Sequence, residues 1–217
     1  EKRQAAAKMS FQSGETSGRK ILEAKGISKN IGGKQICNKF SLSISRGERI
    51  AMVGANGVGK TTLLNILFRD LVPDEGTIKR GTNWITASFE QNKGSLDLDA
   101  SLQENLAGDP DIALPGRSDQ ILVKGVPRHV VGYLKEFLFD PSTLRAPVRS
   151  LSGGEKSRLI LAKLMAKTSN LLLLDEPTND LDIETLDLLQ ELLCEFDGTI
   201  LLICLLYTSD AADDLWC

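Results

Sequence analysis

The chain has 217 residues, of which 41% are hydrophobic and 25% are charged, and its formal net charge is -3. These values are typical of one globular domain with a buried core, and they exclude a disordered or fibrous chain. No apolar run reaches the roughly 18–20 residues that a membrane-spanning helix needs, so we expect no membrane span. The four cysteines form no C-x-x-C pair, which favours a reducing, cytoplasmic setting over a zinc site or a disulfide framework.

Charge is unevenly distributed along the chain. Basic residues exceed acidic ones over residues 1–34, whereas residues 168–217 contain no Lys or Arg. A basic lead segment is suited to contact nucleic-acid phosphates, although a solvated linker is the plainer interpretation of the same charges. Residues 1–20 begin with helix-forming residues and become rich in Gly and Ser, which predicts the end of a helix running into a linker.

Strand signals begin at Ile21. We predict strands over residues 20–24, 40–44 and 49–53, and then a helix over residues 61–71, where the apolar residues lie on one helical stripe. A glycine-rich loop separates the third strand from this helix. Strand, loop and helix therefore follow in the order that a phosphate-binding loop requires.

The middle of the chain, residues 98–145, is predicted to be a helical insert. Apolar positions at 102–106, 121–126 and 130–139 indicate helices, and prolines separate them.

Helices and buried strands alternate after the insert. We expect a helix that ends at Lys167, a strand over residues 171–174, a helix over residues 183–195 and a strand over residues 199–203. Short strands that are apolar throughout and lie between helices are typical of a parallel sheet covered on both faces.

The glycine-rich loop has the pattern G-x-x-x-x-G-K-[ST]. Glycines allow the backbone to turn so that its N–H groups face phosphate oxygens, and the following helix adds its positive end. The pattern predicts binding of a nucleoside triphosphate, ATP in particular, together with Mg²⁺: the lysine would reach the β- and γ-phosphates and the threonine hydroxyl would coordinate the metal. The predicted binding residues here are Gly54, Ala55, Asn56, Gly57, Val58, Gly59, Lys60, Thr61 and Thr62.

A second motif, LSGGE over residues 151–155, matches the signature of ATP-binding cassettes and precedes a strand ending in Asp175 and Glu176. With both motifs, the chain resembles the ATP-binding cassette (ABC) superfamily over residues 21–203. The resemblance implies an α/β fold of the P-loop NTPase type. It would have a parallel core sheet, N-terminal antiparallel strands and an inserted helical subdomain.

The run EPTNDLD, residues 176–182, resembles the ABC-F branch, in which two cassettes are joined by a linker and no membrane domain exists. Residues 141–197 are similar to the second cassette of its Uup-type members, and residues 1–20 to the end of their interdomain linker. This resemblance implies a second cassette upstream in the same chain, the ribosome and tRNA as partners, and DNA as a further candidate partner. The alternative is the nucleotide-binding subunit of an ABC membrane transporter, which would offer its helical insert to a membrane domain.

The resemblance also assigns catalytic and metal-binding roles. Asp175 would hold Mg²⁺ through water, opposite Thr61, and Glu176 would polarise the attacking water. Gln91 would sense both the metal and that water.

The signature residues would act on a different nucleotide. In this family Ser152, Gly153 and Gly154, at the start of a helix, contact the ATP held by the other cassette, and Asp182 lies in the loop between the halves. The resemblance therefore implies a composite site.

The sequence departs from the family at two places. Ile31 stands where cassettes usually place an aromatic residue that stacks on adenine, so we expect apolar contact without stacking. After Ile203 the family has a Ser-His-Asp run whose histidine contacts the γ-phosphate, but this chain reads CLL. Residues 204–217 resemble the translation of a transposase-end sequencing adaptor, so we expect them to be non-native and hydrolysis by this chain to be impaired. We assign His129 no catalytic role.

Overall fold

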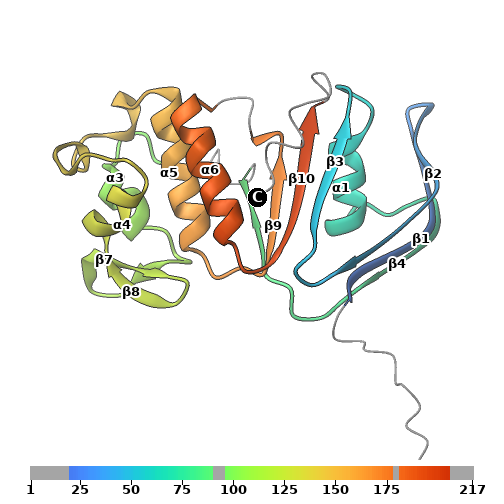
Figure 1. The fold of residues 1–217 in the computed structure, drawn as a ribbon, viewed down its shortest axis with the longest axis horizontal. Helices are drawn as coiled ribbons and strands as arrows, with labels where there is room; N and C mark the ends of the chain where they lie inside the picture. Colours follow the sequence, from blue (N-terminus) through green and yellow to red (C-terminus); the bar gives the residue numbers. More distant parts are fainter. Residues whose placement is uncertain (1–19, 90–95, 178–180, 206–217) are drawn as a thin grey trace, which may run out of the picture.

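Three sheets organise the part of the chain that the structure, a computed structural model, describes: residues 20–89, 96–177 and 181–205 (Figure 1). One is antiparallel with the order β2-β1-β4, one is parallel with the order β3-β10-β9-β5, and one is a small antiparallel sheet with the order β6-β7-β8. The predicted combination of N-terminal antiparallel strands and a parallel core sheet is confirmed.

The first antiparallel sheet is built on a long hairpin. It contains β1 (Lys20–Ile31), β2 (Lys34–Ser45) and β4 (Glu75–Arg80). Gly32 and Gly33 join β1 to β2 with φ angles of 56° and 79°. A two-residue turn with two positive φ angles matches the twist of a hairpin, and glycine adopts such angles without a steric cost.

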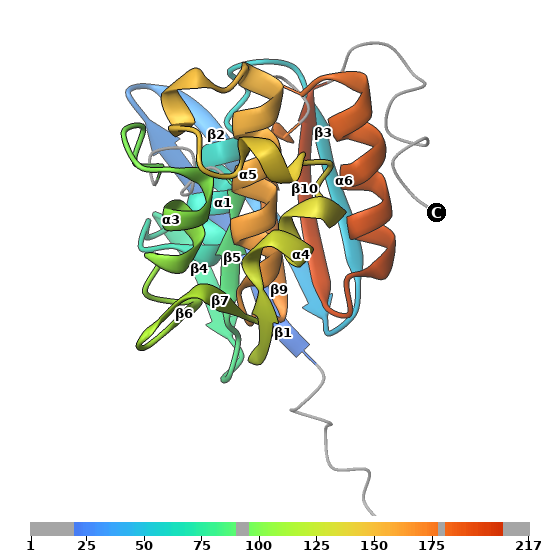
Figure 2. The same ribbon diagram turned by 90° about the vertical axis from the view of Figure 1, so that its left-hand side faces the viewer.

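The parallel sheet lies between layers of helices. It contains β3 (Arg49–Gly54), β5 (Thr86–Ser88), β9 (Leu171–Asp175) and β10 (Thr199–Leu205). Figures 1 and 2 show α1 on one face of this sheet, between it and the antiparallel sheet, and α5 and α6 on the other face. These helices span Lys60–Phe68, Gly153–Ala166 and Ile183–Glu195.

The side chains of β9 alternate between two packed clusters, which explains why its first four residues are all leucine. Leu171 and Leu173 pack in one cluster with Leu64 of α1, whereas Leu172 and Leu174 pack with residues of α5 and α6. Successive side chains of a strand point to opposite faces, so a strand covered on both faces needs an apolar residue at every position. The prediction of a doubly covered sheet is therefore confirmed.

The insert differs from the sequence prediction. Helices α3 (Leu102–Ala107) and α4 (Val130–Glu136) form where helices were expected. The predicted helix over residues 121–126 is wrong, because these residues belong to a hairpin of β7 (Arg117–Val123) and β8 (Val126–His129), with β6 (Ala113–Leu114) beside it. The insert is thus mixed rather than purely helical.

The turn of this hairpin gives the physical reason. Lys124 and Gly125 have φ angles of 49° and 82°, and Val123 pairs with Val126 across them. Two successive positive φ angles cannot occur inside an α-helix, and they form the turn of a tight hairpin.

Buried polar contacts attach the insert to α5. Asp109, which follows α3, pairs with Lys163 of α5 at 3.2 Å, and the side chains of both residues are almost fully buried. The Tyr133 hydroxyl of α4 donates to the carbonyl oxygen of Ala162 at 2.7 Å. A buried ion pair and a buried hydroxyl with a partner both constrain geometry, so α5 and the insert share one packed interface.

Several element boundaries shift by a few residues from their predicted positions. Helix α6 has its predicted bounds, while α5 ends one residue earlier and α1 three residues earlier than expected. Strand β10 continues to Leu205, two residues beyond the predicted end of the domain at Ile203. Two short 3₁₀ helices, Pro141–Thr143 and Val148–Ser150, lead into α5.

None of the helices in the described part of the chain combines the length and the apolar composition that a bilayer span requires.

Candidate functional site

The glycine-rich loop connects β3 to α1 at the carboxyl end of the parallel strands. Gly57 and Gly59 have φ angles of 72° and 109°, and Gly59 is the N-cap of α1, with no side-chain cap on the helix. The first backbone N–H groups of α1 are therefore free of a capping side chain at a positive helix end, which is the arrangement that binds anions. A Cβ atom on Gly59 would lie 2.9 Å from Cγ2 of Ile36, so the site requires glycine for space as well as for conformation.

Lys60 folds back over the loop that precedes it. Its Nζ donates to the carbonyl oxygens of Gly54 at 2.7 Å and Ala55 at 2.9 Å, and only 7% of the residue is exposed. The same Nζ lies 3.5 Å from Oε1 of Glu176. A buried ammonium that rests on neutral carbonyls can exchange them for phosphate oxygens, which bind a cation more strongly.

Thr61 joins α1 to the end of β9. Its Oγ1 donates to Oδ2 of Asp175 at 2.7 Å, and Oδ1 of Asp175 is buried without a hydrogen-bond partner among the described residues. A buried carboxylate oxygen without a partner is costly unless a ligand is to satisfy it. Carboxylate and hydroxyl oxygens are the ligands that Mg²⁺ prefers, so these residues fit the predicted metal.

Glu176 has an unusual backbone conformation directly after β9. Its φ of 48° lies in the left-handed region, and its N–H donates to the carbonyl oxygen of Ile203 in β10 at 2.9 Å. Such angles are uncommon for residues other than glycine and cluster at functional sites. The neighbouring strand thus fixes the backbone that directs this carboxylate toward Lys60.

A cleft of about 290 Å³ is lined by most of the residues that the sequence predicted to bind this chain's own nucleotide. It brings Ile31, the predicted adenine contact, together with the loop, the start of α1 and Glu176. Two residues of β2, Lys34 and Ile36, line it as well, and the sequence prediction did not include them. The lining residues are Ile31, Lys34, Ile36, Gly57, Gly59, Lys60, Thr61, Thr62 and Glu176.

The signature residues lie outside this cleft. Ser152 is the N-cap of α5 and forms a capping box with Glu155: Oγ of Ser152 accepts from the Glu155 N–H at 3.2 Å, and Oε2 of Glu155 accepts from the Ser152 N–H at 2.8 Å. The latter bond lowers the pKa of Glu155. Gly153 is exposed and faces open space.

Asp182 packs against the signature helix of the same chain. It is the N-cap of α6 and accepts from the Thr185 N–H at 2.8 Å, and its interactions with the side chain and the backbone of Thr185 lower its pKa. A Cβ atom on Gly154 would overlap Oδ2 of Asp182. Three predicted residues, Ser152, Gly154 and Asp182, therefore form a second cluster at the starts of α5 and α6.

The Gly154 contact makes a prediction about stability. Replacing Gly154 by Ala should lower the free energy of unfolding by about 2 kcal/mol, because the new methyl group must displace Asp182 from its cap. Thermal unfolding should show a midpoint lower by roughly 4–8 °C. Gly153→Ala is the matched control: its methyl group meets nothing within 4 Å, so it should leave the midpoint unchanged or raise it slightly. Equal midpoints for the two variants would contradict this account of Gly154.

Of the remaining residues considered in the sequence analysis, those that the structure describes are not among the residues that line the cleft. Ala55, Asn56 and Val58 are exposed on the loop. Gln91 lies outside the described residues. His129 is exposed and caps α4 by accepting from the Val131 N–H at 3.2 Å, away from the residues that line the cleft.

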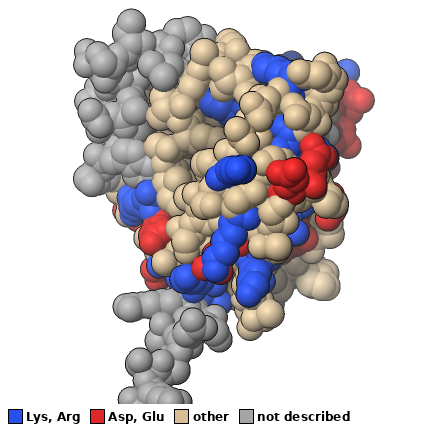
Figure 3. All heavy atoms as spheres, turned by 90° about the vertical axis from the view of Figure 1, so that its right-hand side faces the viewer, with Lys and Arg blue, Asp and Glu red and all other residues tan. Residues whose placement is uncertain are grey.

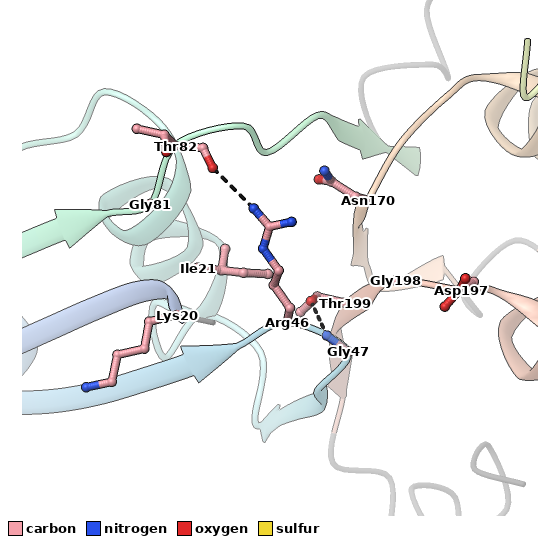
Figure 4. A pocket seen from close by; sticks show the side chains of 10 residues that line it. All are labelled: Lys20, Ile21, Arg46, Gly47, Gly81, Thr82, Asn170, Asp197, Gly198 and Thr199. Atoms are coloured by element: carbon pink, nitrogen blue, oxygen red, sulfur yellow. Dashed lines mark hydrogen bonds between the residues drawn. The ribbon is translucent and has the colours of Figure 1, made fainter. Parts of the chain in front are cut away.

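A second cavity, of about 340 Å³, lies at the opposite ends of the parallel strands (Figure 4). It is lined by residues that precede or begin the strands, including Gly47, Asn170 and Thr199. Arg46 extends across it and donates to the carbonyl oxygen of Thr82 at 3.4 Å. Ligands of open α/β sheets bind at the carboxyl ends of the strands, so this cavity is not the nucleotide site.

Most of the residues of this site fall within a region that matches a known protein family. The protein-family model described as "ABC transporter" matches residues 37–179, which include the phosphate loop, the signature and Asp175-Glu176. The chain belongs to the ABC family. Proteins of this family bind ATP through such cassettes, usually with Mg²⁺, and are ATPases, so the resemblance drawn from the sequence is confirmed at the level of the family.

The cassette is similar to several curated proteins. It is 48% identical to the ATP-binding protein Uup of Caulobacter vibrioides over 90% of this chain and 46% identical to that of Escherichia coli over 91%. It is 34% identical to the energy-dependent translational throttle protein EttA of Haemophilus influenzae over 94%. The chain spans only 31%, 30% and 35% of the lengths of these three relatives.

Solved structures share the fold of the cassette. The structure of cbiO1 from Clostridium perfringens, part of the ABC transporter complex cbiONQ, has a TM-score of 0.64 and 24% identity, and covers 86% of this chain and 78% of that one. A bacterial Atm1-family ABC exporter with ATP bound has a TM-score of 0.65 and 21% identity, over 87% and 35% of the two chains. Likenesses at this level of identity support the fold alone.

Proposed function

We propose that this chain is one cassette of a cytoplasmic twin-cassette ABC-F ATPase that acts in translation on the ribosome. The observation that carries the ATPase part is the position of Glu176, which directs a carboxylate to within 3.5 Å of the Lys60 ammonium at a phosphate-binding loop. A carboxylate held there is placed to act on a water molecule beside the terminal phosphate.

The proposed mechanism assigns one task to each side chain. Lys60 exchanges its loop carbonyls for oxygens of the β- and γ-phosphates, while the N–H groups at the start of α1 bind the same phosphate chain. Thr61 and Asp175 would hold Mg²⁺, which neutralises negative charge on the phosphates when it is bound. Glu176 orients the attacking water and accepts its proton at the carboxylate.

The proposed site is composite. Ser152, Gly154 and Asp182 lie together at two helix starts but do not line the cleft that contains Lys60. A helix N-terminus is suited to a phosphate group, so these residues would complete the site of another cassette. We propose that efficient hydrolysis requires that partner, and that the chain alone binds ATP but hydrolyses it slowly.

Likeness to the curated relatives supports the ABC-F and ribosome part of the proposal. Two are named ATP-binding protein Uup, and a third is named a translational throttle protein. On the side of the antiparallel sheet, basic side chains lie at several places, some beside acidic ones (Figure 3). Lys25 pairs with Glu23 and Lys29 with Asp74, so part of this charge is already compensated, and we assign RNA contact to no particular face.

A transporter subunit is the alternative that the fold permits, because solved transporter cassettes share it. The two functions differ in what surrounds the cassette. An ABC-F chain carries a second cassette, whereas a transporter subunit docks its insert on a membrane protein.

The test uses the complete gene product. We expect the gene to encode a second cassette upstream of Glu1, and the full-length protein to co-sediment with ribosomes in the presence of ATP and not in its absence. A gene with a single cassette, or a full-length protein that never co-sediments with ribosomes, would overturn the proposal. Association of the insert with a membrane protein would then favour the transporter subunit.

A further inference from the structure

The β1–β2 hairpin presents three side chains to the phosphate loop. Ile31 and Lys34 are direct partners across the two-glycine turn, so their side chains lie on the same face of the hairpin. Ile36 lies at an irregularity of the strand register, between Gln35 and Cys37, which pair with Asn30 and Lys29, and its side chain also packs against the loop, at Gly59. All three residues line the cleft with the loop.

The contacts of Lys34 and Ile36 show that the hairpin packs against the loop. Nζ of Lys34 donates to the carbonyl oxygen of Gly57, and Ile36 approaches Gly59 so closely that a Cβ atom there would lie 2.9 Å from Cγ2 of Ile36. Gly57 and Gly59 are the two positive-φ residues of the loop. The hairpin thus supplies a cationic group at the turn in the backbone that is to receive the phosphates.

Two ammonium groups therefore reach the loop from different elements. Lys60 comes from α1 and occupies the carbonyls of Gly54 and Ala55, while Lys34 comes from β2 and occupies the carbonyl of Gly57. Among the described residues that line the cleft, Glu176 is the only acidic one. A carbonyl is a weaker acceptor than a phosphate oxygen, so both ammonium groups gain by exchanging their present partners for a phosphate chain.

Weak contact with the adenine base would increase the contribution of this second cation to nucleotide affinity. Ile31 is 44% exposed and offers apolar area but no π face, so adenine gains little stacking there. Binding energy for the nucleotide must then come mainly from its phosphates.

We propose that Lys34 is a second phosphate-binding cation of the nucleotide site, which shifts recognition from the base to the phosphate chain. The inference rests on the proposed nucleotide function and extends it to a residue outside the phosphate-loop motif. Lys34 releases Gly57 and binds the phosphate chain, while Lys60 holds the β- and γ-phosphates.

The experiment measures the affinity of the 217-residue chain for ATP, ADP and adenosine by calorimetry. Lys34→Met keeps most of the length and the apolar stem but removes the charge, and should weaken ATP and ADP binding roughly 5- to 20-fold. The affinity for adenosine should not change. The dependence of ATP affinity on salt concentration should also become less steep, since one ionic contact is lost.

Two further variants serve as controls. Lys34→Arg keeps the charge and should retain affinity within about threefold. Lys39→Met removes another exposed lysine of β2 that does not line the cleft, and should have no effect on any of the three ligands.

The outcomes are separable. Equal affinity of Lys34→Met and the unchanged chain for ATP would overturn the role of Lys34 while leaving the nucleotide site intact. An equal loss for ATP and adenosine, together with a lower unfolding temperature without nucleotide, would also overturn it, because Lys34 would then only support the loop. If the unchanged chain binds none of these nucleotides, the proposed function itself fails.

Discussion

Replacing Lys60 by Ala is expected to weaken ATP binding by roughly 100-fold, since it removes the buried cation that we propose binds the phosphates. The truncation should also weaken ADP binding, because we propose that the lysine binds the β-phosphate as well as the γ-phosphate. In the structure this ammonium is already almost fully buried and contacts Gly54, Ala55 and Glu176, so its position does not depend on a ligand to order it. Calorimetric titration of the 217-residue chain gives both affinities.

A matched control separates loss of the cation from loss of structure. Lys79→Ala removes an exposed lysine of β4 that does not line the cleft and should bind ATP like the unchanged chain. Thermal unfolding without nucleotide shows whether Lys60→Ala still folds. If a folded Lys60→Ala variant binds ATP with unaltered affinity, the assignment of the loop is wrong.

Replacing Glu176 by Gln should leave ATP binding intact or slightly tighter while it lowers turnover by about 10²- to 10⁴-fold. The amide is close in size but cannot accept the proton of the attacking water, and it removes a negative charge that faces the phosphates. Because the nucleotide then persists, ATP should hold the two cassettes that we propose for the full-length protein in the closed state. Limited proteolysis or an intramolecular distance measurement with ATP and with ADP would detect that state.

Glu195→Gln, at the exposed end of α6, is the control for the change of charge. It should have the turnover of the unchanged protein and should open after each cycle. Unchanged turnover in the Glu176→Gln variant would remove Glu176 from its proposed role. It would also leave the left-handed backbone at this residue without a functional reason.

Local sequence signals predicted the parts of the fold that depend on near neighbours. The motif at the phosphate loop and the apolar runs of β9 and β10 identified the strand–loop–helix unit and the doubly covered sheet, because those patterns follow from burial on both faces. The hairpin around Lys124 and Gly125 was missed because a short apolar run such as residues 121–126 fits a helix as well as a strand. The glycine at the turn of this hairpin, Gly125, was the sequence signal that could have identified it.

The candidate site was predictable where one motif contains its residues and not where two distant segments meet. Lys34 carries no motif of its own, and only its pairing with Ile31 across two glycines indicated that it shares a face with the expected adenine contact. The packing of Asp182 against Gly154 joins residues of two helices. The contact of Lys34 with Gly57 and the packing of Asp182 against Gly154 both depend on how strands and helices pack in three dimensions, so spacing along the chain did not predict them.

The covering of β9 on both faces has a mechanical consequence for Asp175 and Glu176. These carboxylates continue directly from four leucines that are held between α1 on one side and α5 and α6 on the other. Reaction rates respond to displacements of reacting groups of about 1 Å, and a close-packed interior transmits a missing methylene as a shift of its neighbours. The positions of these two carboxylates therefore depend on the hydrophobic layers on both faces of the strand, so an aliphatic side chain that does not contact the nucleotide can still alter their proposed roles.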